Sequence, residues 1–421
     1  MGAAIKRSQR ALLAGSLVLS GAVTTALLGG ALPASAASVV QTIGVGSAPS
    51  GVSSDGTHVW VTNLGGNTVT ELNASTGAFV QTIGVGNSPY GISSDGTHVW
   101  VANAGFPGNT VSELSASTGA VVQTIGIANS PSGVSSDGNH VWVTSVGGNT
   151  VTELSASTGA IVQTIGVGNS PYEISSDGTH VWVANYGGNT VTELSASTGA
   201  VIQTIGVGNS PFGISSDGTH VWVTSVGGNT VTELSASTGA FVQTIGVGSA
   251  PYGVSSDGTD VWVTNVSGST VTQLSALTDA VIQTIGVGRS PLGVSSDGHS
   301  SWVANQLDNT VSEIAISFSV ATTNLPPATR GTAYGPVTLQ AADLGVSTSP
   351  NTTTLKWKKI ALPKGVKLSS AGVLSGTPRV KLTPGPGSVT VQVTETVTTL
   401  NGKKKVKTKT TVQATISLTI T

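Results

Sequence analysis

Histidine and aspartate recur at fixed positions of this 421-residue chain, and both residue types can bind metals or transfer protons. Five of the six histidines follow an Asp-Gly turn at one repeated position: His58, His98, His140, His180 and His220. Zinc needs nitrogens about 2.0–2.1 Å from one ion, whereas packed sheets lie about 10 Å apart, so neighbouring units cannot easily share an ion. We therefore expect no metal site and no cofactor, and we interpret these histidines as solvent-facing turn residues.

The acidic residues follow the same repeat. Seven of them precede the glycine of a turn: Asp55, Asp95, Asp137, Asp177, Asp217, Asp257 and Asp297. Six others recur on a later strand: Glu71, Glu113, Glu153, Glu193, Glu233 and Glu313. Aspartate favours such turns because its side chain bonds nearby backbone N–H groups. There is no D-x-D-x-D-G calcium loop, although calcium binding by the acidic surface stays open, and the absence of Cys excludes thiolate metal sites and disulfides.

A unit of about 40 residues positions these side chains. Its tryptophan recurs at Trp60, Trp100, Trp142, Trp182, Trp222, Trp262 and Trp302. Each unit holds four apolar-alternating runs separated by turn sequences, which is the size of one propeller blade. An extra fourth strand near 38–45 and a last unit that stops after its third strand are complementary, and pairing them removes a sheet edge. We predict an all-β chain with a seven-bladed β-propeller over 38–317, closed by the N-terminal strand.

The repeat contains the turn S-D-G, V-W-V-T-N at 59–63, G-N-T-V-T-E-L, and S-T-G-A-x-V-Q-T-I-G-V-G. These runs resemble the YVTN family of β-propeller repeats, found in bacterial and archaeal surface-layer and exported proteins. Tryptophan stands where that family often has tyrosine. The resemblance covers about 280 residues and implies the fold. It does not imply one function, because relatives include surface proteins, lactonases and an antibiotic-cleaving lyase family.

The segment before the repeat is typical of an exported protein. Lys6, Arg7 and Arg10 precede an apolar stretch from about 11 to 32 and an Ala-Ser-Ala motif at 34–36. We predict a signal peptide over 1–36 rather than a membrane-spanning helix. The mature chain would then have no transmembrane segment and would be secreted, extracellular or on the cell surface.

The segment after the repeat predicts a second domain. Beyond a linker at 318–323, residues 324–421 contain short strands with Pro-Gly turns, about the size of an immunoglobulin-like β-sandwich. The runs at 330–334 and 368–378 resemble an Ig-like family of bacterial surface proteins, here without the usual Cys pair. A terminal hairpin is predicted through Asn401-Gly402.

Charge separates the two predicted domains. Residues 38–317 carry 17 acidic residues and one basic residue, whereas residues 318–421 carry 13 basic and two acidic residues. Four of the lysines share one face of a strand: Lys403, Lys405, Lys407 and Lys409. Such a stripe can bind an anionic cell-envelope polymer by counterion release. A solvated edge strand protected by lysine, or docking onto the acidic propeller, are the alternatives, and nucleic acid is not an expected partner of an exported protein.

Departures from the repeat mark the candidate site. The first strand of each unit begins with one variable residue, in order Ser50, Tyr90, Ser132, Tyr172, Phe212, Tyr252 and Leu292. The loop after the tryptophan strand varies as well, in order Leu64, Phe106, Val146, Tyr186, Val226, Val266 and Leu307. Both connections lie on the same face of a propeller. Glu173 replaces a glycine at the channel mouth, and Arg289 replaces an Asn or Ser nearby.

We predict that these departures form an exposed recognition rim for a protein or glycan ligand. Its members are Tyr90, Tyr172, Glu173, Tyr186, Phe212, Tyr252 and Arg289. Drift at loop positions without a ligand is the alternative.

A non-enzymatic surface or interaction protein is the function we favour from the sequence, with the Ig-like domain serving adhesion or spacing. Catalysis needs a base or nucleophile together with its own partner in one place, and we assign no catalytic residue. A lactonase- or lyase-like propeller enzyme acting on a small ligand at the channel mouth is the second reading. A purely structural surface-layer role is the third.

Overall fold

The computed structural model describes residues 37–105 and 109–315 continuously, and beyond them only separate strand segments between 319 and 420. The predicted signal peptide, Phe106 and Lys403 lie outside the described residues. Within the described part, no helix is long and apolar enough to cross a membrane.

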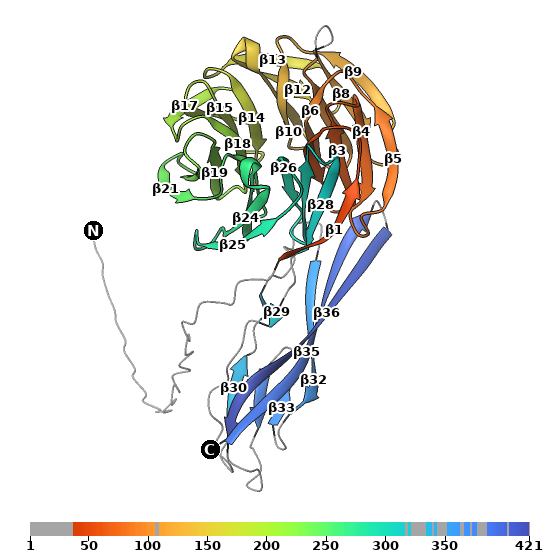
Figure 1. Ribbon diagram of the computed structural model, residues 1–421, viewed down its shortest axis with the longest axis vertical. Coiled ribbons are helices and arrows are strands. Elements are labelled where there is room, and N and C mark those ends of the chain that lie inside the picture. Colours follow the sequence, from red (N-terminus) through yellow and green to blue (C-terminus); the bar gives the residue numbers. More distant parts are fainter. Residues whose placement is uncertain are drawn as a thin grey trace, which may run out of the picture. The chain divides into compact units, whose positions relative to one another are not determined.

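Residues 38–315 form seven four-stranded antiparallel sheets, the blades of a propeller (Figure 1). Blade 1 contains β2 (Pro49–Ser54), β3 (His58–Asn63), β4 (Thr68–Asn73) and β5 (Phe79–Gly84). Blade 2 contains β6 (Pro89–Ser94), β7 (His98–Asn103), β8 (Thr110–Ser115) and β9 (Val121–Gly126). Blade 3 contains β10 (Pro131–Ser136), β11 (His140–Ser145), the 3-10 turn η1 (Val146–Gly148), β12 (Thr150–Ser155) and β13 (Ile161–Gly166).

Blade 4 contains β14 (Pro171–Ser176), β15 (His180–Asn185), β16 (Thr190–Ser195) and β17 (Val201–Gly206). Blade 5 contains β18 (Pro211–Ser216), β19 (His220–Ser225), β20 (Thr230–Ser235) and β21 (Phe241–Gly246). Blade 6 contains β22 (Pro251–Ser256), β23 (Asp260–Asn265), the 3-10 turn η2 (Val266–Gly268), β24 (Thr270–Ser275) and β25 (Val281–Gly286). Blade 7 contains β26 (Pro291–Ser296), β27 (Ser300–Asn305), β28 (Thr310–Ala315) and the N-terminal β1 (Ser38–Gly44).

The ring is closed by the pairing of β1 with β28. The two strands run antiparallel, with Gln41 opposite Glu313 and Ile43 opposite Val311. The first strands also contact one another around the ring, and β26 of the last blade meets β2 of the first. The predicted seven-bladed propeller, closed by its N-terminal strand, is therefore confirmed.

The core lies between adjacent blades, which explains why the second strand of each unit is apolar on both faces. All seven repeat tryptophans are fully buried. Trp60 of blade 1, for example, packs in one cluster with Val99, Val101 and Leu114 of blade 2. Each blade thus completes its neighbour's core. Replacing one such tryptophan by alanine would lower the free energy of unfolding by about 3–5 kcal/mol.

Polar side chains also join neighbouring blades. Asp55 Oδ1 accepts hydrogen bonds from the backbone N–H groups of Thr57 (2.9 Å) and His58 (2.7 Å), as expected of a turn-forming aspartate. Its Oδ2 accepts a hydrogen bond from the Ser94 hydroxyl of blade 2 at 3.0 Å. The same bond recurs where the ring closes, between Ser54 and Asp297 at 2.8 Å. The repeated S-S-D sequence therefore makes both the turn and the contact between blades.

Beyond residue 318 the structure describes three small sheets. β29 (Ser319–Val320), within the predicted linker, pairs with β31 (Ala341–Ala342). β30 (Tyr334–Thr338), β34 (Val373–Gly376) and β33 (Val366–Leu368) form the second sheet. β32 (Thr352–Ala361), β35 (Gly385–Asn401) and β36 (Lys404–Ile420) form the third.

The last two strands form the predicted terminal hairpin, with Asn401 opposite Lys404. Lys405, Lys407 and Lys409 occupy alternate positions of β36, and the basic face that the sequence predicts for them stays a prediction. The Ig-like sandwich stays a prediction.

Candidate functional site

The start of each first strand and the loop after the second strand lie at the same end of a blade. In blade 4 the backbone N–H of Tyr186 donates to the carbonyl of Ser170 at 3.0 Å. Pro171 also lies opposite Asn185 in the strand pairing. The two variable series predicted from the sequence therefore do share one rim.

Five aromatic side chains from four blades form a cluster at this rim, with Phe212 in its centre. The rings of Phe212 and Tyr252 stack with centroids 3.7 Å apart, and Tyr172 lies 4.9 Å from Phe212 on the other side. Tyr186 meets Tyr172 edge-on at 5.4 Å, and Tyr90 meets Phe212 edge-on at 6.5 Å. Such contacts are typical of stabilising aromatic pairs.

The cluster is less exposed than the sequence led us to expect. Phe212 retains only 4% of its accessible surface, whereas Tyr186 retains 37%. Phe212 is covered by the rings of Tyr172 and Tyr252, which lie against it. Phe212 thus supports the tyrosines more than it offers a surface of its own, and the prediction of a fully exposed rim is wrong for this residue.

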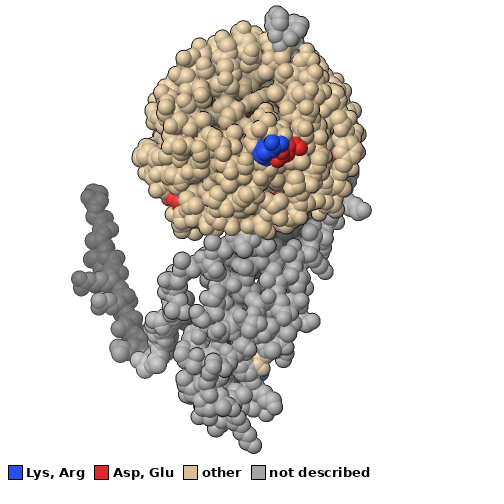
Figure 2. Space-filling model, in the orientation of Figure 1, with Lys and Arg blue, Asp and Glu red and all other residues tan. Residues whose placement is uncertain are grey.

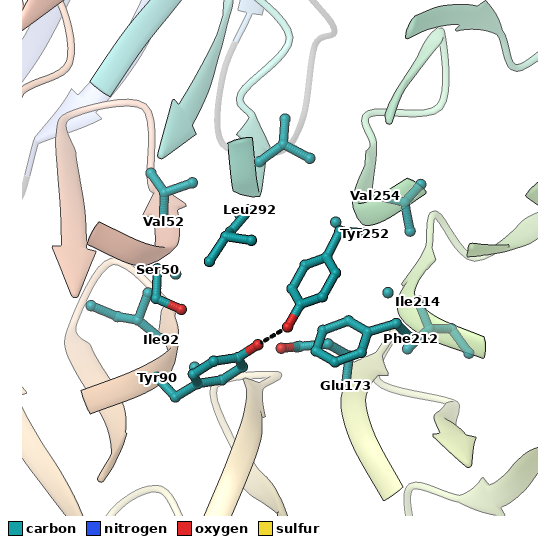
Figure 3. Close-up of a pocket in the computed structure, with 16 residues that line it drawn as sticks. Ser50, Val52, Tyr90, Ile92, Glu173, Phe212, Ile214, Tyr252, Val254 and Leu292 are labelled. Carbon is teal, nitrogen blue, oxygen red and sulfur yellow. Dashed lines mark hydrogen bonds between the residues drawn. The ribbon is translucent and has the colours of Figure 1, made fainter. Parts of the chain in front are cut away.

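Two tyrosines meet across the channel (Figure 3). The hydroxyls of Tyr90, from β6, and Tyr252, from β22, are hydrogen-bonded to each other. Burial, chiefly, raises the pKa of Tyr90 and of Tyr252 above the ordinary tyrosine value, so both hydroxyls stay protonated at physiological pH. One of the two hydroxyl hydrogens forms the bond between the tyrosines, so the other can be donated to a further acceptor.

Glu173 stands where the other six blades have glycine. Those glycines, at 51, 91, 133, 213, 253 and 293, lie where neighbouring blades approach closely. A Cβ atom at Gly91 would come within 2.4 Å of the carbonyl oxygen of Ser132, and one at Gly213 within 2.2 Å of that of Tyr252. A side chain at this position therefore requires a local shift of the backbone. Residues that break a structural rule in this way often belong to functional sites.

The Glu173 carboxyl is held among protein atoms with no charged partner among the described residues. Its side chain keeps some accessible surface because it lines the channel. Desolvation nevertheless raises its pKa to about 7. A carboxyl group with a perturbed pKa, placed in a cavity, is a candidate functional group.

A cavity of about 90 Å³ opens at this point. Tyr90, Glu173, Phe212 and Tyr252 line it together with residues that are not aromatic, such as Ser50 and Leu292. Figure 3 shows Tyr90, Tyr252, Phe212 and Glu173 converging on the space between the first strands. The arrangement can hold a small group between aromatic rings, two hydroxyls and one carboxylate.

Arg289, predicted as part of the rim, is not among the residues that line this cavity. Its guanidinium Nε donates to Asp308 Oδ1 at 2.6 Å, and its side chain is 70% exposed. Figure 2 shows few charged groups on the visible face of the propeller: one prominent basic group beside acidic atoms, and a few other acidic atoms, among them a patch at the left edge. The aspartate in the neighbouring loop holds Arg289 away from Glu173, and the two do not form one polar site.

The repeated histidines are not simple solvent-facing turn residues, and that interpretation was wrong. His58 Nδ1 lies 3.5 Å from Asp55 Oδ2, and its Nε2 lies 3.8 Å from Glu71 Oε1. The His58 ring packs beside Trp60 with centroids 5.6 Å apart, and its side chain is 25% exposed. The imidazole therefore covers the buried Glu71 carboxylate.

The exceptions in blades 6 and 7 support this structural role. Asp260 takes the histidine position in blade 6, and its partner on the next strand is Gln273, which donates to Asp260 Oδ1 at 2.9 Å. In blade 7, Ser300 donates to Glu313 at 2.9 Å. Both positions change in blade 6 and only the first changes in blade 7, and each blade keeps a polar contact between them. Among the described residues, no group of three or more His, Asp or Glu side chains is arranged to hold a metal ion.

The comparisons with known proteins support the fold alone. No protein-family model and no curated sequence matches the chain. Among solved structures, a streptogramin B lyase is 19% identical (TM-score 0.57; 66% of this chain and 97% of the lyase covered). Virginiamycin B lyase from Staphylococcus aureus is 17% identical (TM-score 0.57; 66% and 99% covered). Hydrazine synthase from Kuenenia stuttgartiensis is 18% identical (TM-score 0.58; 70% and 100% covered). The chain is thus similar in fold to propellers of diverse function, and its resemblance to YVTN repeats stays a prediction.

Proposed function

We propose that this chain is a secreted, non-enzymatic binding protein whose propeller takes a ligand at the channel mouth. The observation that carries the proposal is the convergence of Tyr90, Phe212 and Tyr252 on Glu173 in one cavity. These residues come from four blades that are otherwise nearly identical in sequence. Fold stability alone gives no reason for tyrosines in some blades and Ser50, Ser132 or Leu292 in others.

The C-terminal segment would serve adhesion or spacing. Its lysines at 405, 407 and 409 alternate along β36, an order that would place them on one face, and a basic face binds polyanions by releasing their counterions. An anionic envelope polymer is the partner that this proposal assigns to it. Two weak contacts on one chain reinforce each other when both can form at once.

Binding to isolated bacterial envelope tests the proposal. The full mature chain is compared with a variant that carries Tyr90→Ala, Tyr172→Ala and Tyr252→Ala. The matched control replaces Phe79 and Phe241 by Ala, since these aromatics are exposed on the outer strands β5 and β21. We expect the tyrosine variant to lose binding at high salt and the control to retain it. Equal binding by all three proteins would overturn the role of the rim.

Two further variants complete the test. Tyr186→Ala removes the most exposed ring of the cluster, so it reports on the rim if the triple variant fails to fold. Replacing Lys405, Lys407 and Lys409 by Gln should remove only the binding that salt releases. If it does not, the lysines belong to a solvated edge strand.

The enzymatic reading has one observation in its favour. A carboxyl whose pKa is about 7 is suited to general acid–base catalysis, and Glu173 is such a group. An enzyme would lose all turnover of a small lactone or ester in the Glu173→Gln variant. A screen of such substrates in which parent and variant are equally inactive supports the binding function.

A further inference from the structure

We infer that the channel mouth binds the positively charged head group of its ligand, a quaternary or primary ammonium, between Glu173 and the rings of Tyr90 and Tyr252. This inference rests on the proposed binding function and adds the chemical class of the ligand to it.

The first observation is the missing counter-charge. Arg289 is the one Lys or Arg in residues 38–315, and it is engaged with Asp308 outside the cavity. An ionised Glu173 thus has no cationic partner in the described propeller. A buried carboxylate without a partner is unfavourable, and a cationic ligand would supply the missing charge. The acidic excess of the propeller adds an attractive field for cations and repels anions.

The second observation is the aromatic wall beside the carboxyl. Tyr252 lines the cavity and is supported from behind by Phe212, whose ring centroid lies 3.7 Å away, and Tyr90 reaches the same place from the opposite side of the channel (Figure 3). The faces of aromatic rings attract cations, and quaternary ammonium groups are recognised by rings grouped in this way. Both tyrosine hydroxyls are neutral, so they add no charge that would compete with the ligand.

The third observation is the size of the space. A cavity of about 90 Å³ is far smaller than the roughly 300–1,000 Å³ of pockets that enclose a whole small-molecule ligand. It therefore fits a head group, while the rest of the ligand lies over the rim. There Tyr186, which is 37% exposed and packs against Tyr172, provides a surface for it.

The site should be sensitive to pH through Glu173. The titratable groups that face this carboxyl are the hydroxyls of Tyr90 and Tyr252, and Tyr172 is its neighbour in the chain. The pKa of Glu173 is about 7, so about a tenth of the carboxyls are ionised at pH 6 and about nine-tenths at pH 8. A cation that needs the ionised form then binds about tenfold more tightly at pH 8.

Calorimetric titration of the full mature chain with matched probes tests the inference. The probes are choline, n-butylammonium and the neutral choline isostere 3,3-dimethylbutan-1-ol. We expect an ammonium probe to bind at least tenfold more tightly than the neutral isostere. Glu173→Gln should weaken that binding at least tenfold and remove its pH dependence. Asp308→Asn removes the same charge from the exposed pair with Arg289 and should leave binding unchanged.

The contrary results separate this inference from the proposed function. Equal binding of the neutral isostere, or an unchanged affinity in Glu173→Gln, would show that the rings bind apolar groups and would overturn the ammonium assignment alone. No binding of either ammonium probe at millimolar concentration would overturn it as well. The envelope experiment with the tyrosine variants decides the proposed function in each of these cases.

Discussion

Replacing Glu173 by Gln is expected to stabilise the propeller at alkaline pH. Gln keeps the size and the Cβ atom of Glu but cannot ionise, so the substitution isolates the cost of the charge. Desolvation raises the pKa of Glu173 from 4.5 to about 7 on folding. The folded state therefore holds this proton more tightly than the unfolded chain, and stability is lost as the pH rises from 4.5 through 7.

The size of the effect follows from that pKa. One unit of pKa corresponds to about 1.36 kcal/mol, so a rise from 4.5 to about 7 destabilises the ionised chain by about 3 kcal/mol at pH 8. At pH 5 the group is mostly protonated in the folded chain, and the cost is about 1 kcal/mol or less. Glu173→Gln should thus increase the free energy of unfolding by about 2–3 kcal/mol at pH 8 and by much less at pH 5.

Urea denaturation followed by tryptophan fluorescence measures this difference, because all seven repeat tryptophans are buried. Asp308→Asn is the matched control. The hydrogen bonds from Arg289 hold the pKa of Asp308 below its ordinary value, so removing this carboxylate should not stabilise the chain at pH 8. An equal gain in Glu173→Gln at pH 5 and pH 8, or a loss at pH 8, would refute the assignment of Glu173 as a desolvated carboxyl without a charged partner.

Three further outcomes are expected. Asp260→His alone should destabilise blade 6, whereas Asp260→His with Gln273→Glu rebuilds the His–Glu pair of blades 1–5. A double-mutant cycle in urea should give a coupling energy of about 0.5–3 kcal/mol between the two positions. Thr224→Ala should lower the free energy of unfolding by about 1–2 kcal/mol, since it leaves the carbonyl of Tyr252 without its 2.8 Å bond; an unchanged urea midpoint would contradict this. Deleting residues 37–44 should expose the edge of β28 and cause association seen by light scattering, and a peptide of that sequence should reverse it; a monodisperse truncated chain would mean that closure is dispensable.

The fold was predictable because every local signal repeats. Most units carry the same turn sequences and all carry the tryptophan strand, so one correct interpretation applies to the whole array. The leftover strand at 38–44 also specified how the ring closes. The same regularity made part of the rim predictable, because Tyr90, Tyr172 and Glu173 differ from the residues at the equivalent positions of other units.

What could not be predicted depends on distances between blades. The sequence places Tyr90 and Tyr252 at equivalent positions of blades 2 and 6, but only the diameter of the channel brings their hydroxyls together. Arg289 was predicted as a member of the same rim as Glu173, but Asp308, also a departure from the repeat, pairs with it. The role of His58 was missed because its partner Glu71 lies on the next strand, although the joint change of both positions in blade 6 was a signal in the sequence.

Near-identity of the blades makes each one a control for the others, and this bears most on Glu173. At six of seven positions the close approach of the next blade's carbonyl group is accommodated by glycine. A side chain at the seventh position is unfavourable because of its Cβ atom, and again because of a carboxylate without a partner. Drift would favour substitutions with little effect on stability, such as those on the exposed outer strands. Glu173 combines both unfavourable effects, and it lies in a cavity lined by tyrosines that only some blades have. This combination favours the proposed ligand site over drift.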